Sequence, residues 1–307
     1  MMKIDRVIIW GHKPRHYHTH SHIHSSYYKA FKSLGYETYW FDNDDAKKIQ
    51  NMNFDGSLFF TEGQVDQKIP LNEKSAYILH HCKNDKYLQA GNKILNLCNY
   101  LKYCEEGISF NYKDTGNTVE KFGDFLFYDQ KALALYQPWA TDLLPDEINL
   151  NNPCMFDDSK KDVNYIGSIW EENINQIRPF IQACKDHRKR FRHFKGGISD
   201  ERNQRLVQKS FISPDIRGEW HKECGYIPCR IFKNISYGQV AGINSLHVYE
   251  KFNGLIAYSE DTYELFNACV GKAKSISHKQ IIDSMIYIRD YHTYINRINN
   301  LLRFIDL

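Results

Sequence analysis

The stretch FKNISYGQVAGINSLHVYEKF, residues 232–252, carries the strongest local signal for the fold. Apolar residues up to Ile235 predict a strand, a loop with two glycines follows, and Asn244 and Ser245 stand where a helix is capped. At such a junction the free backbone N–H groups and the positive end of the helix dipole favour a phosphate or diphosphate. An ordinary strand-to-helix turn with a capped helix is the alternative.

Two charged side chains lie close to this predicted junction. Lys233 would add a full positive charge to a phosphate site. Glu250 falls on the predicted helix, where its carboxylate would accept hydrogen bonds from ribose or sugar hydroxyls. Together they indicate a ligand that carries both phosphate and hydroxyl groups.

Strands and helices alternate through the rest of the chain. The run RVIIWG at residues 6–11 is typical of a buried parallel strand, and an amphipathic helix near residues 23–34 and an aromatic strand at residues 36–41 follow it. A second series begins with a strand at residues 162–169. The alternation predicts an α/β fold of two Rossmann-like domains, each with a parallel sheet.

Four further elements are expected from the same patterns. Residues 89–103 are predicted to be a helix, and residues 124–128 and 132–136 are predicted to be short strands. Residues 278–305 carry a long apolar stripe, which predicts one long C-terminal helix.

A segment with prolines and many polar residues, 137–161, separates the two series. We therefore predict an N-terminal domain of residues 1–155 and a C-terminal domain of residues 156–307, with the helix 278–305 packing back on the first. Ligands of open parallel sheets bind at the carboxyl ends of the strands. Residues 12–24, the Gly167 and Ser168 turn, and residues 233–245 are expected to converge on a cleft between the domains.

The composition limits the classes of function. Among 307 residues, 42% are hydrophobic. The 40 basic side chains are nearly balanced by 37 acidic ones, so the protein has no strong positive electrostatic field that would favour binding of nucleic acid. No run of about 18 apolar residues occurs, so no membrane span is expected. The first residues are expected to form a strand and not a signal peptide. Eight scattered cysteines without a C-x-x-C pair are typical of reduced thiols, so we expect a cytoplasmic protein.

Six of the 14 histidines are concentrated after the first predicted strand, at His12, His16, His18, His20, His22 and His24. One of them could act as a general base on a substrate hydroxyl. Several could bind a metal ion, if their imidazoles converge. The structural alternative is a solvated or phosphate-contacting loop.

The metal interpretation has a specific form. The residues HTHS at 18–21 resemble the opening motif of PHP-type metal-dependent phosphoesterases. No later H-x-H or D-x-H pattern supplies further ligands, and two α/β halves differ from a single barrel. This phosphoesterase is the alternative function.

Other catalytic signatures are missing from the sequence. It contains no G-x-S-x-G elbow, no Walker A pattern and no G-x-G-x-x-G fingerprint. Basic residues between 188 and 195 are expected to form a solvated helix end. The nearest approach to a metal-binding D-x-D motif is DND at residues 42–44, which is expected to be a turn at the end of a strand.

The whole pattern resembles GT-B glycosyltransferases. The segments GHKPRHYHTHSHIHSSYYKAFKSLGYETYWFD, YQPWATDLLP, NYIGS and FKNISYGQVAGINSLHVYE are similar to segments of small glycosyltransferases of giant viruses and marine microbes, which are distantly similar to spore-maturation-type glycosyltransferases. The resemblance implies two facing Rossmann-like domains and sugar transfer from a nucleotide-diphosphate sugar to a hydroxyl of a glycan or other acceptor. It implies no metal, no cofactor and no partner besides these substrates.

The resemblance also implies roles for individual residues. The donor would be bound by residues of the second domain, namely Gly167, Ser168, Lys233, Ser236, Tyr237, Asn244, Ser245, Tyr249 and Glu250. We expect inverting transfer, in which His20, ahead of His18, removes the acceptor proton. His12 and His22 are expected to contact the acceptor.

Overall fold

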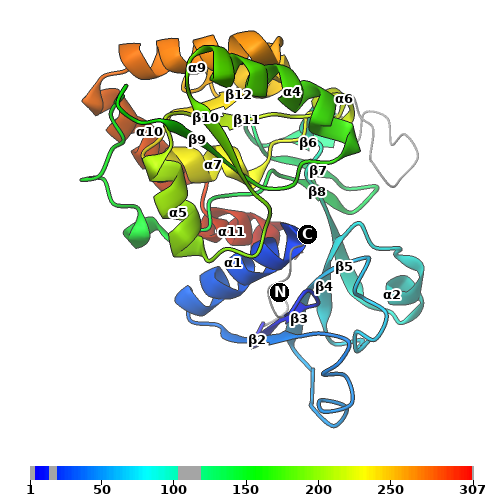
Figure 1. The fold of residues 1–307 in the computed structure, drawn as a ribbon. Helices are drawn as coiled ribbons and strands as arrows, with labels where there is room; N and C mark the ends of the chain where they lie inside the picture. The colour runs from blue at the N-terminus through cyan, green and yellow to red at the C-terminus, as the bar shows by residue number, and fades with distance from the viewer. Residues whose placement is uncertain (1–3, 14–18, 103–118, 306–307) are drawn as a thin grey trace. The chain divides into compact units, whose positions relative to one another are not determined.

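The computed structural model of the chain describes residues 4–13, 19–102 and 119–305. The chain divides into two compact units (Figure 1). Unit 1 consists of Met1–Trp139 together with Tyr294–Leu307, and unit 2 of Ala140–Thr293. The division falls earlier than the predicted boundary at 155/156, and the last residues belong with the first unit.

Unit 1 is built on an eight-stranded sheet of order β2-β1-β3-β4-β5-β8-β7-β6. Neighbouring strands are parallel from β2 through to β8, and β7 and β6 continue the sheet in antiparallel fashion. Its strands are β1 (Arg6–Trp10), β2 (Glu37–Phe41), β3 (Ser57–Glu62), β4 (Ala76–His80), β5 (Lys93–Cys98), β6 (Val119–Lys121), β7 (Phe127–Asp129) and β8 (Ala134–Tyr136).

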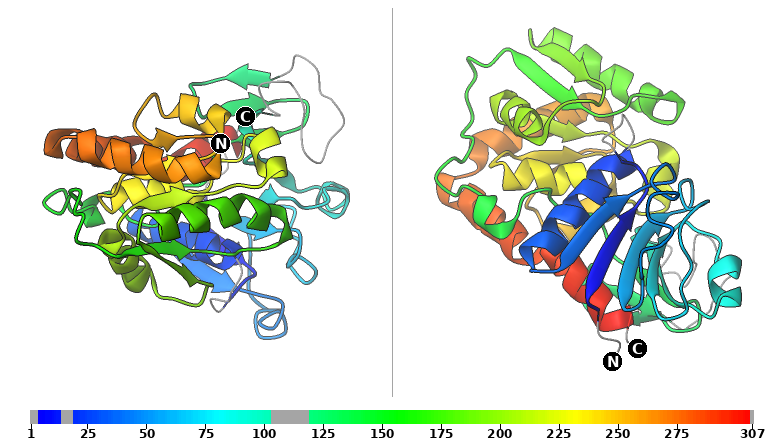
Figure 2. Two further views of the ribbon diagram at one scale, coloured as in Figure 1. Left: turned by 45° about the horizontal axis from the view of Figure 1, so that its top comes forward. Right: turned by 90° about the horizontal axis from the view of Figure 1, so that it is seen from below.

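Two helices, α1 (Thr19–Ser33) and α11 (Tyr294–Ile305), lie side by side on one face of this sheet (Figure 2, right). The ring of Tyr27 joins the layers, because it packs 4.2 Å from the Phe60 ring and 4.7 Å from the Tyr294 ring. The opposite face is covered by connecting segments and by the short helix α2 (Asp85–Gln89). Burial on both faces explains why β1 reads as a continuous apolar run.

Unit 2 contains two groups of parallel strands, β10-β9 and β11-β12-β13. The backbone N–H of Phe211 donates to the carbonyl of Asp162 at 2.8 Å, which ties β9 to the segment entering β11. The strands are β9 (Asp162–Ile166), β10 (Arg190–Phe194), β11 (Ser213–Asp215), β12 (Ala241–Ile243) and β13 (Ala257–Tyr258).

Helices cover both faces of the unit 2 strands, with α4 and α9 on one face and α5 and α7 on the other (Figure 1). A single 3-10 turn, η1 (Pro145–Glu147), precedes the first strand of the unit. The helices are α4 (Glu171–Asp186), α5 (Asp200–Lys209), α6 (Glu219–Glu223), α7 (Cys229–Ser236), α8 (Leu246–Lys251), α9 (Thr262–Ser275) and α10 (His278–Tyr291).

The prediction for the opening stretch was wrong in one respect. The apolar residues up to Ile235 belong to helix α7, and the strand before Asn244 is the short β12. Ile231, Phe232 and Ile235 recur at positions i, i+1 and i+4, which place them on one buried helical face. Ser245 does stand at the N-cap of α8, although its side chain makes no capping hydrogen bond.

Two of the predicted helices were also wrong. Within the predicted helix 89–103, α2 ends at Gln89 and the next residues form β5. The predicted single helix 278–305 is two helices, α10 and α11, separated by His292 and Thr293. The ring of His292 stacks on Phe232 at 4.9 Å, which fixes the break within unit 2.

The observed fold class is mixed α/β with a mostly parallel main sheet, as the alternation of elements predicts. Among the described residues, no helix combines the length and the apolar character needed to cross a lipid bilayer. Seven cysteines are described and all have free thiols, and Cys104 lies outside the described residues.

Candidate functional site

Polar side chains gather at the carboxyl ends of three neighbouring strands in unit 1. His12 follows β1, Glu62 is the last residue of β3, and His80 is the last residue of β4 and pairs in register with Glu62. His20 and His24 come from the first turns of α1, one helical turn apart. We call these five residues the histidine cluster.

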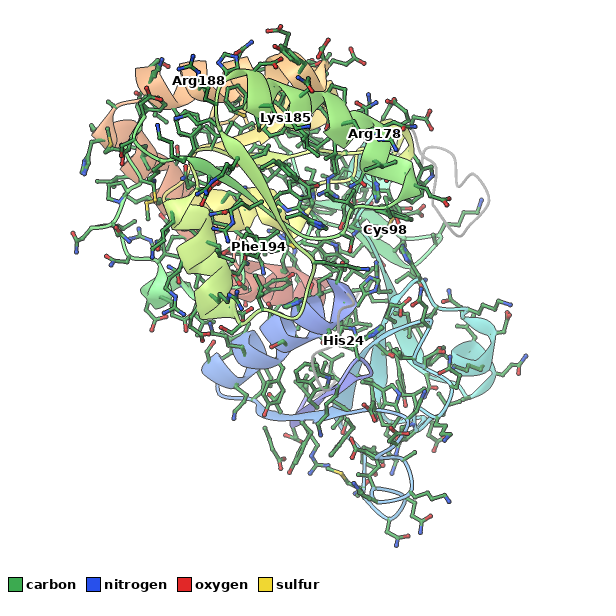
Figure 3. The ribbon with its side chains drawn as sticks, viewed as in Figure 1. His24, Cys98, Arg178, Lys185, Arg188 and Phe194 are labelled. Atoms are coloured by element: carbon green, nitrogen blue, oxygen red, sulfur yellow. The ribbon has the colours of Figure 1, made fainter. Side chains whose placement is uncertain are left out.

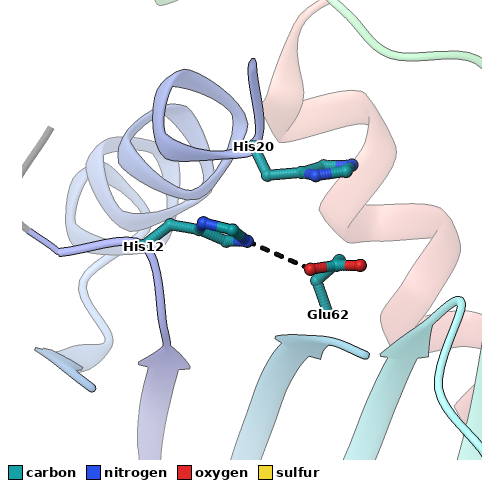
Figure 4. Close-up of side chains that lie close together, drawn as sticks. All are labelled: His12, His20 and Glu62. Atoms are coloured by element: carbon teal, nitrogen blue, oxygen red, sulfur yellow. Dashed lines mark hydrogen bonds and ion pairs between the residues drawn. The ribbon is translucent and has the colours of Figure 1, made fainter. Parts of the chain in front are cut away.

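The centre of the histidine cluster is formed by His12, His20 and Glu62 (Figure 4). Nε2 of His12 is hydrogen-bonded to Oε2 of Glu62 at 3.1 Å, and both side chains are more than nine-tenths buried. One ligand atom from each of the three residues lies within 4.8 Å of the other two. The arrangement joins a carboxylate to two imidazoles, which suits proton transfer or metal binding.

Surrounding groups hold His12 in place. Nδ1 of His24 is hydrogen-bonded to the carbonyl of Gly11 at 3.0 Å, and the His24 ring packs edge-on against that of His12. The Ser21 hydroxyl donates to the carbonyl of His12 at 3.0 Å. These contacts stabilise a left-handed backbone at His12, with φ of 56°, a conformation that costs energy for a non-glycine residue. Such strain is typical of functional sites.

His80 is almost completely enclosed, with a relative exposure of 2%. Its ring lies 5.0 Å from that of His20 and 4.9 Å from that of Trp139, and it stacks on His81 at 3.9 Å. Nε2 of His80 makes no hydrogen bond to any residue that the structure describes. Burial, together with the neighbouring imidazoles, lowers the pKa of His80 well below the usual value.

The low pKa of His80 predicts acid sensitivity. Below about pH 6.5 the unfolded chain binds a proton at this residue that the folded chain does not, so stability falls as the pH drops from 7 to 5. Denaturant titrations at several pH values should show this fall, and it should be smaller in His80→Phe. An equal slope in both proteins would contradict the prediction. The titratable groups around His80 are His12, His20, His24, Glu62 and His81.

The sequence predicted only part of this cluster. His12 and His20, expected in the acceptor and base roles, are brought together. His22 is half-buried on α1 and does not belong to the group of three, and His18 lies outside the described residues. Glu62 was missed, because the sequence shows it only as an acidic residue after a short apolar run, and the order of the strands brings it to the histidines.

A second polar site lies in unit 2, at the carboxyl ends of β9 and β11. Nη1 of Arg230 donates to Oδ1 of Asp215 at 2.6 Å and to the hydroxyl of Tyr165 at 3.0 Å. Nε of Arg217 donates to the same Oδ1 at 3.0 Å, and its Nη2 also pairs with Asp215. Arg217 and Arg230, which we call the arginine pair, thus share Asp215, and the Asp215 side chain is fully buried.

The arginine pair carries more positive charge than its shared carboxylate offsets. The two guanidinium groups retain only 12% and 18% side-chain exposure, so water screens them weakly. Gly167 follows β9 with φ of 134°, and a β-carbon at this position would collide with the guanidinium of Arg230. The positive φ favours a glycine at this position, and the close approach of the backbone to the Arg230 guanidinium suits an anionic ligand.

Asn244 has a structural role at this edge. Its Oδ1 accepts from the backbone N–H of Arg217 at 2.7 Å, and its Nδ2 donates to the Arg217 carbonyl at 2.9 Å. Asn244 is fully buried and Ser245 almost so. The side chain of Asn244, a predicted donor-binding residue, thus fixes the loop that carries Arg217 through two hydrogen bonds.

Three other predicted donor-binding residues form a buried polar network. Nζ of Lys233 lies 3.0 Å from a carboxylate oxygen of Asp142, and the hydroxyl of Tyr237 donates to both Asp142 oxygens at 2.7 and 2.8 Å. The Ser236 hydroxyl is 2.7 Å from that of Thr141. Although burial disfavours the cation, Asp142 raises the pKa of Lys233 above its usual value.

The remaining predicted donor-binding residues are more open to solvent. Gly167 is half-buried beside the arginine pair, and Ser168 is exposed next to it. On α8, Glu250 is exposed, whereas Tyr249 stacks on Tyr258 at 5.1 Å. Their roles stay predictions.

The sequence did not reveal the arginine pair. Neither arginine falls in a recognisable motif. They meet because Arg217 follows β11, Arg230 lies on α7, and both reach Asp215 at the end of β11.

Comparisons with protein-family models and with curated proteins find no match to this chain.

Proposed function

We propose that this protein transfers a sugar from a nucleotide-diphosphate sugar to a hydroxyl of a glycan or other acceptor. The observation that carries the proposal is the arginine pair, in which two weakly solvated guanidinium groups share one buried carboxylate at the carboxyl edge of a parallel sheet. A diphosphate is the kind of ligand that offsets such an excess of positive charge, and guanidinium groups bind phosphate oxygens in fixed geometry.

The proposed reaction forms a bond between the acceptor oxygen and the anomeric carbon, while the bond from that carbon to the diphosphate breaks. The nucleoside diphosphate leaves with the electron pair, and the acceptor proton passes to His20. The arginine pair stabilises the departing negative charge. His20 retains some exposure at the start of α1, beside His12 and Glu62, which supports its role as the base.

A metal-dependent phosphoesterase is the weaker candidate. PHP-type phosphoesterases bind their metal ions through ligands from many parts of the chain. The described residues provide one group of three potential metal ligands, His12, His20 and Glu62. This phosphoesterase would also leave the arginine pair of unit 2 without a role. We therefore propose the transferase.

A thermal-shift panel tests the ligand class. UDP-, GDP- and TDP-sugars are each added to the full chain, and the one that raises the melting temperature identifies the donor base. Transfer and hydrolysis of that donor are then measured. The absence of any shift with all three donors would contradict the proposal, and a shift without turnover would indicate a binding protein.

The base role predicts a specific effect of His20→Ala. Loss of a general base lowers the rate of transfer about 10²- to 10⁴-fold, whereas donor affinity stays unchanged because His20 lies in unit 1. Steady-state kinetics with the identified donor measure both quantities. His278→Ala, an exposed histidine at the start of α10, is the matched control. Undiminished transfer in His20→Ala would remove this residue from the base role.

A further inference from the structure

We infer that the histidine cluster contains a binding site for one divalent transition-metal ion, held by His12, His20 and Glu62. Ligands of a tetrahedral zinc ion lie about 2.0–2.2 Å from the metal and therefore about 3.3–3.6 Å from one another. The His12 and Glu62 atoms are already 3.1 Å apart, and all three ligand atoms lie within 4.8 Å. Binding of the ion would bring the three atoms to the spacing of a zinc site.

The ligand types select the class of metal. Two imidazoles and one carboxylate match the three protein ligands of many zinc sites, with a fourth position left for water. Magnesium and calcium prefer oxygen ligands alone, so they fit this site poorly. Zn²⁺ is therefore the expected ion, and Co²⁺ and Ni²⁺ are expected to replace it.

Outer contacts prepare the site for an ion. The backbone N–H of Gln64 donates to Oε2 of Glu62 at 3.1 Å, and this fixes the carboxylate. His24 and Ser21 hold the His12 ring and backbone through the contacts described above. Orienting partners of this kind accompany most metal ligands in proteins.

His80 provides a second, independent indication of a ligand. Its side chain is almost completely buried beside His20, yet Nε2 makes no hydrogen bond within the described part of the chain. Leaving a buried polar atom without a partner is energetically unfavourable. A water molecule on the bound ion would supply that partner.

The inference does not rest on the proposed function. An ion held by His20 occupies a lone pair that a general base needs, so metal binding and base catalysis by His20 exclude each other. The expected consequence is that Zn²⁺ inhibits sugar transfer.

The test is a calorimetric titration of Zn²⁺ into the full chain after removal of metal by a chelator. We expect one tight site per chain, and Co²⁺ should give the visible absorption of a four- or five-coordinate complex. Glu62→Gln keeps the size of the side chain and removes the anionic ligand, so it should bind Zn²⁺ at least ten- to a hundredfold more weakly. His278→Ala should bind as the unchanged protein does.

Two results would overturn the inference. One is the absence of a saturable site of unit stoichiometry in the unchanged protein. The other is equal affinity in Glu62→Gln, which would assign the ion to other histidines of the chain. Circular dichroism of the metal-free variant shows whether it is folded, and the Co²⁺ spectrum of the unchanged protein needs no variant. Failure here leaves the nucleotide-sugar thermal shift unaffected, so the two proposals are separable.

Discussion

In Arg230→Ala, donor binding is expected to weaken about ten- to a hundredfold. A hydrogen bond between charged groups contributes about 1.5–3 kcal/mol, and removal of Arg230 deletes such contacts to the diphosphate. The fold should tolerate the change, because Asp215 keeps its ion pair with Arg217. The variant thus removes the excess positive charge without leaving a buried carboxylate unpaired. Titration of the nucleotide sugar identified by thermal shift measures the effect.

Two further variants make this test specific. Arg230→Lys keeps the charge but loses the planar fork, so it should retain only part of the affinity. Arg178 is an exposed arginine on α4 of the same unit (Figure 3), and Arg178→Ala should bind the donor normally. Unchanged donor affinity in Arg230→Ala would refute the role of the arginine pair.

In Lys233→Met, the free energy of unfolding is expected to fall by about 3–5 kcal/mol. The substitution leaves Asp142 in a buried site without its cation, and breaking one side of a buried ion pair has a cost of this size. Adding Asp142→Asn should restore part of the loss, because the amide still accepts from Tyr237 and no buried charge remains. Urea denaturation of the two single variants and the double variant measures the coupling between the two residues.

An exposed ion pair provides the control. Lys279 pairs with Asp283 on α10, with side-chain exposures of 85% and 53%, so Lys279→Met should change stability by less than about 1 kcal/mol. If Lys233→Met instead weakened donor binding and left stability unchanged, the interpretation drawn from the sequence would be correct and Lys233 would contact the diphosphate.

The sequence predicted the secondary structure correctly where the order of apolar and polar residues is compatible with only one kind of element. The run at residues 7–10 is apolar throughout and lies in β1, where it is buried on both faces. The strand predicted around Ile231 and Ile235 was wrong, because three apolar residues at positions i, i+1 and i+4 are compatible with either a short strand or a helix. The true strand, β12, has only three residues and includes a glycine, so it carries almost no strand signal.

The candidate sites were harder to predict for a different reason. Histidines that crowd one loop are visible in any sequence, so His12 and His20 could be selected. Glu62 joins them only through the order of β1, β3 and β4 in the sheet, which the sequence does not reveal. Likewise Arg217 and Arg230 meet on Asp215 through tertiary packing between separate elements.

Unit 1 is assembled from two distant parts of the chain, and this has a consequence for biosynthesis. Arg297 of α11 donates to the carbonyls of Pro138 and Trp139 at 2.8 and 3.1 Å, and Ile298 and Leu301 are completely buried. On the ribosome, α11, which covers one face of this sheet together with α1, emerges only after all of unit 2 has been made. The earlier-synthesised half must therefore wait with an uncovered apolar surface while the later half completes its own fold, and it is in this interval that a nascent chain is most exposed to aggregation.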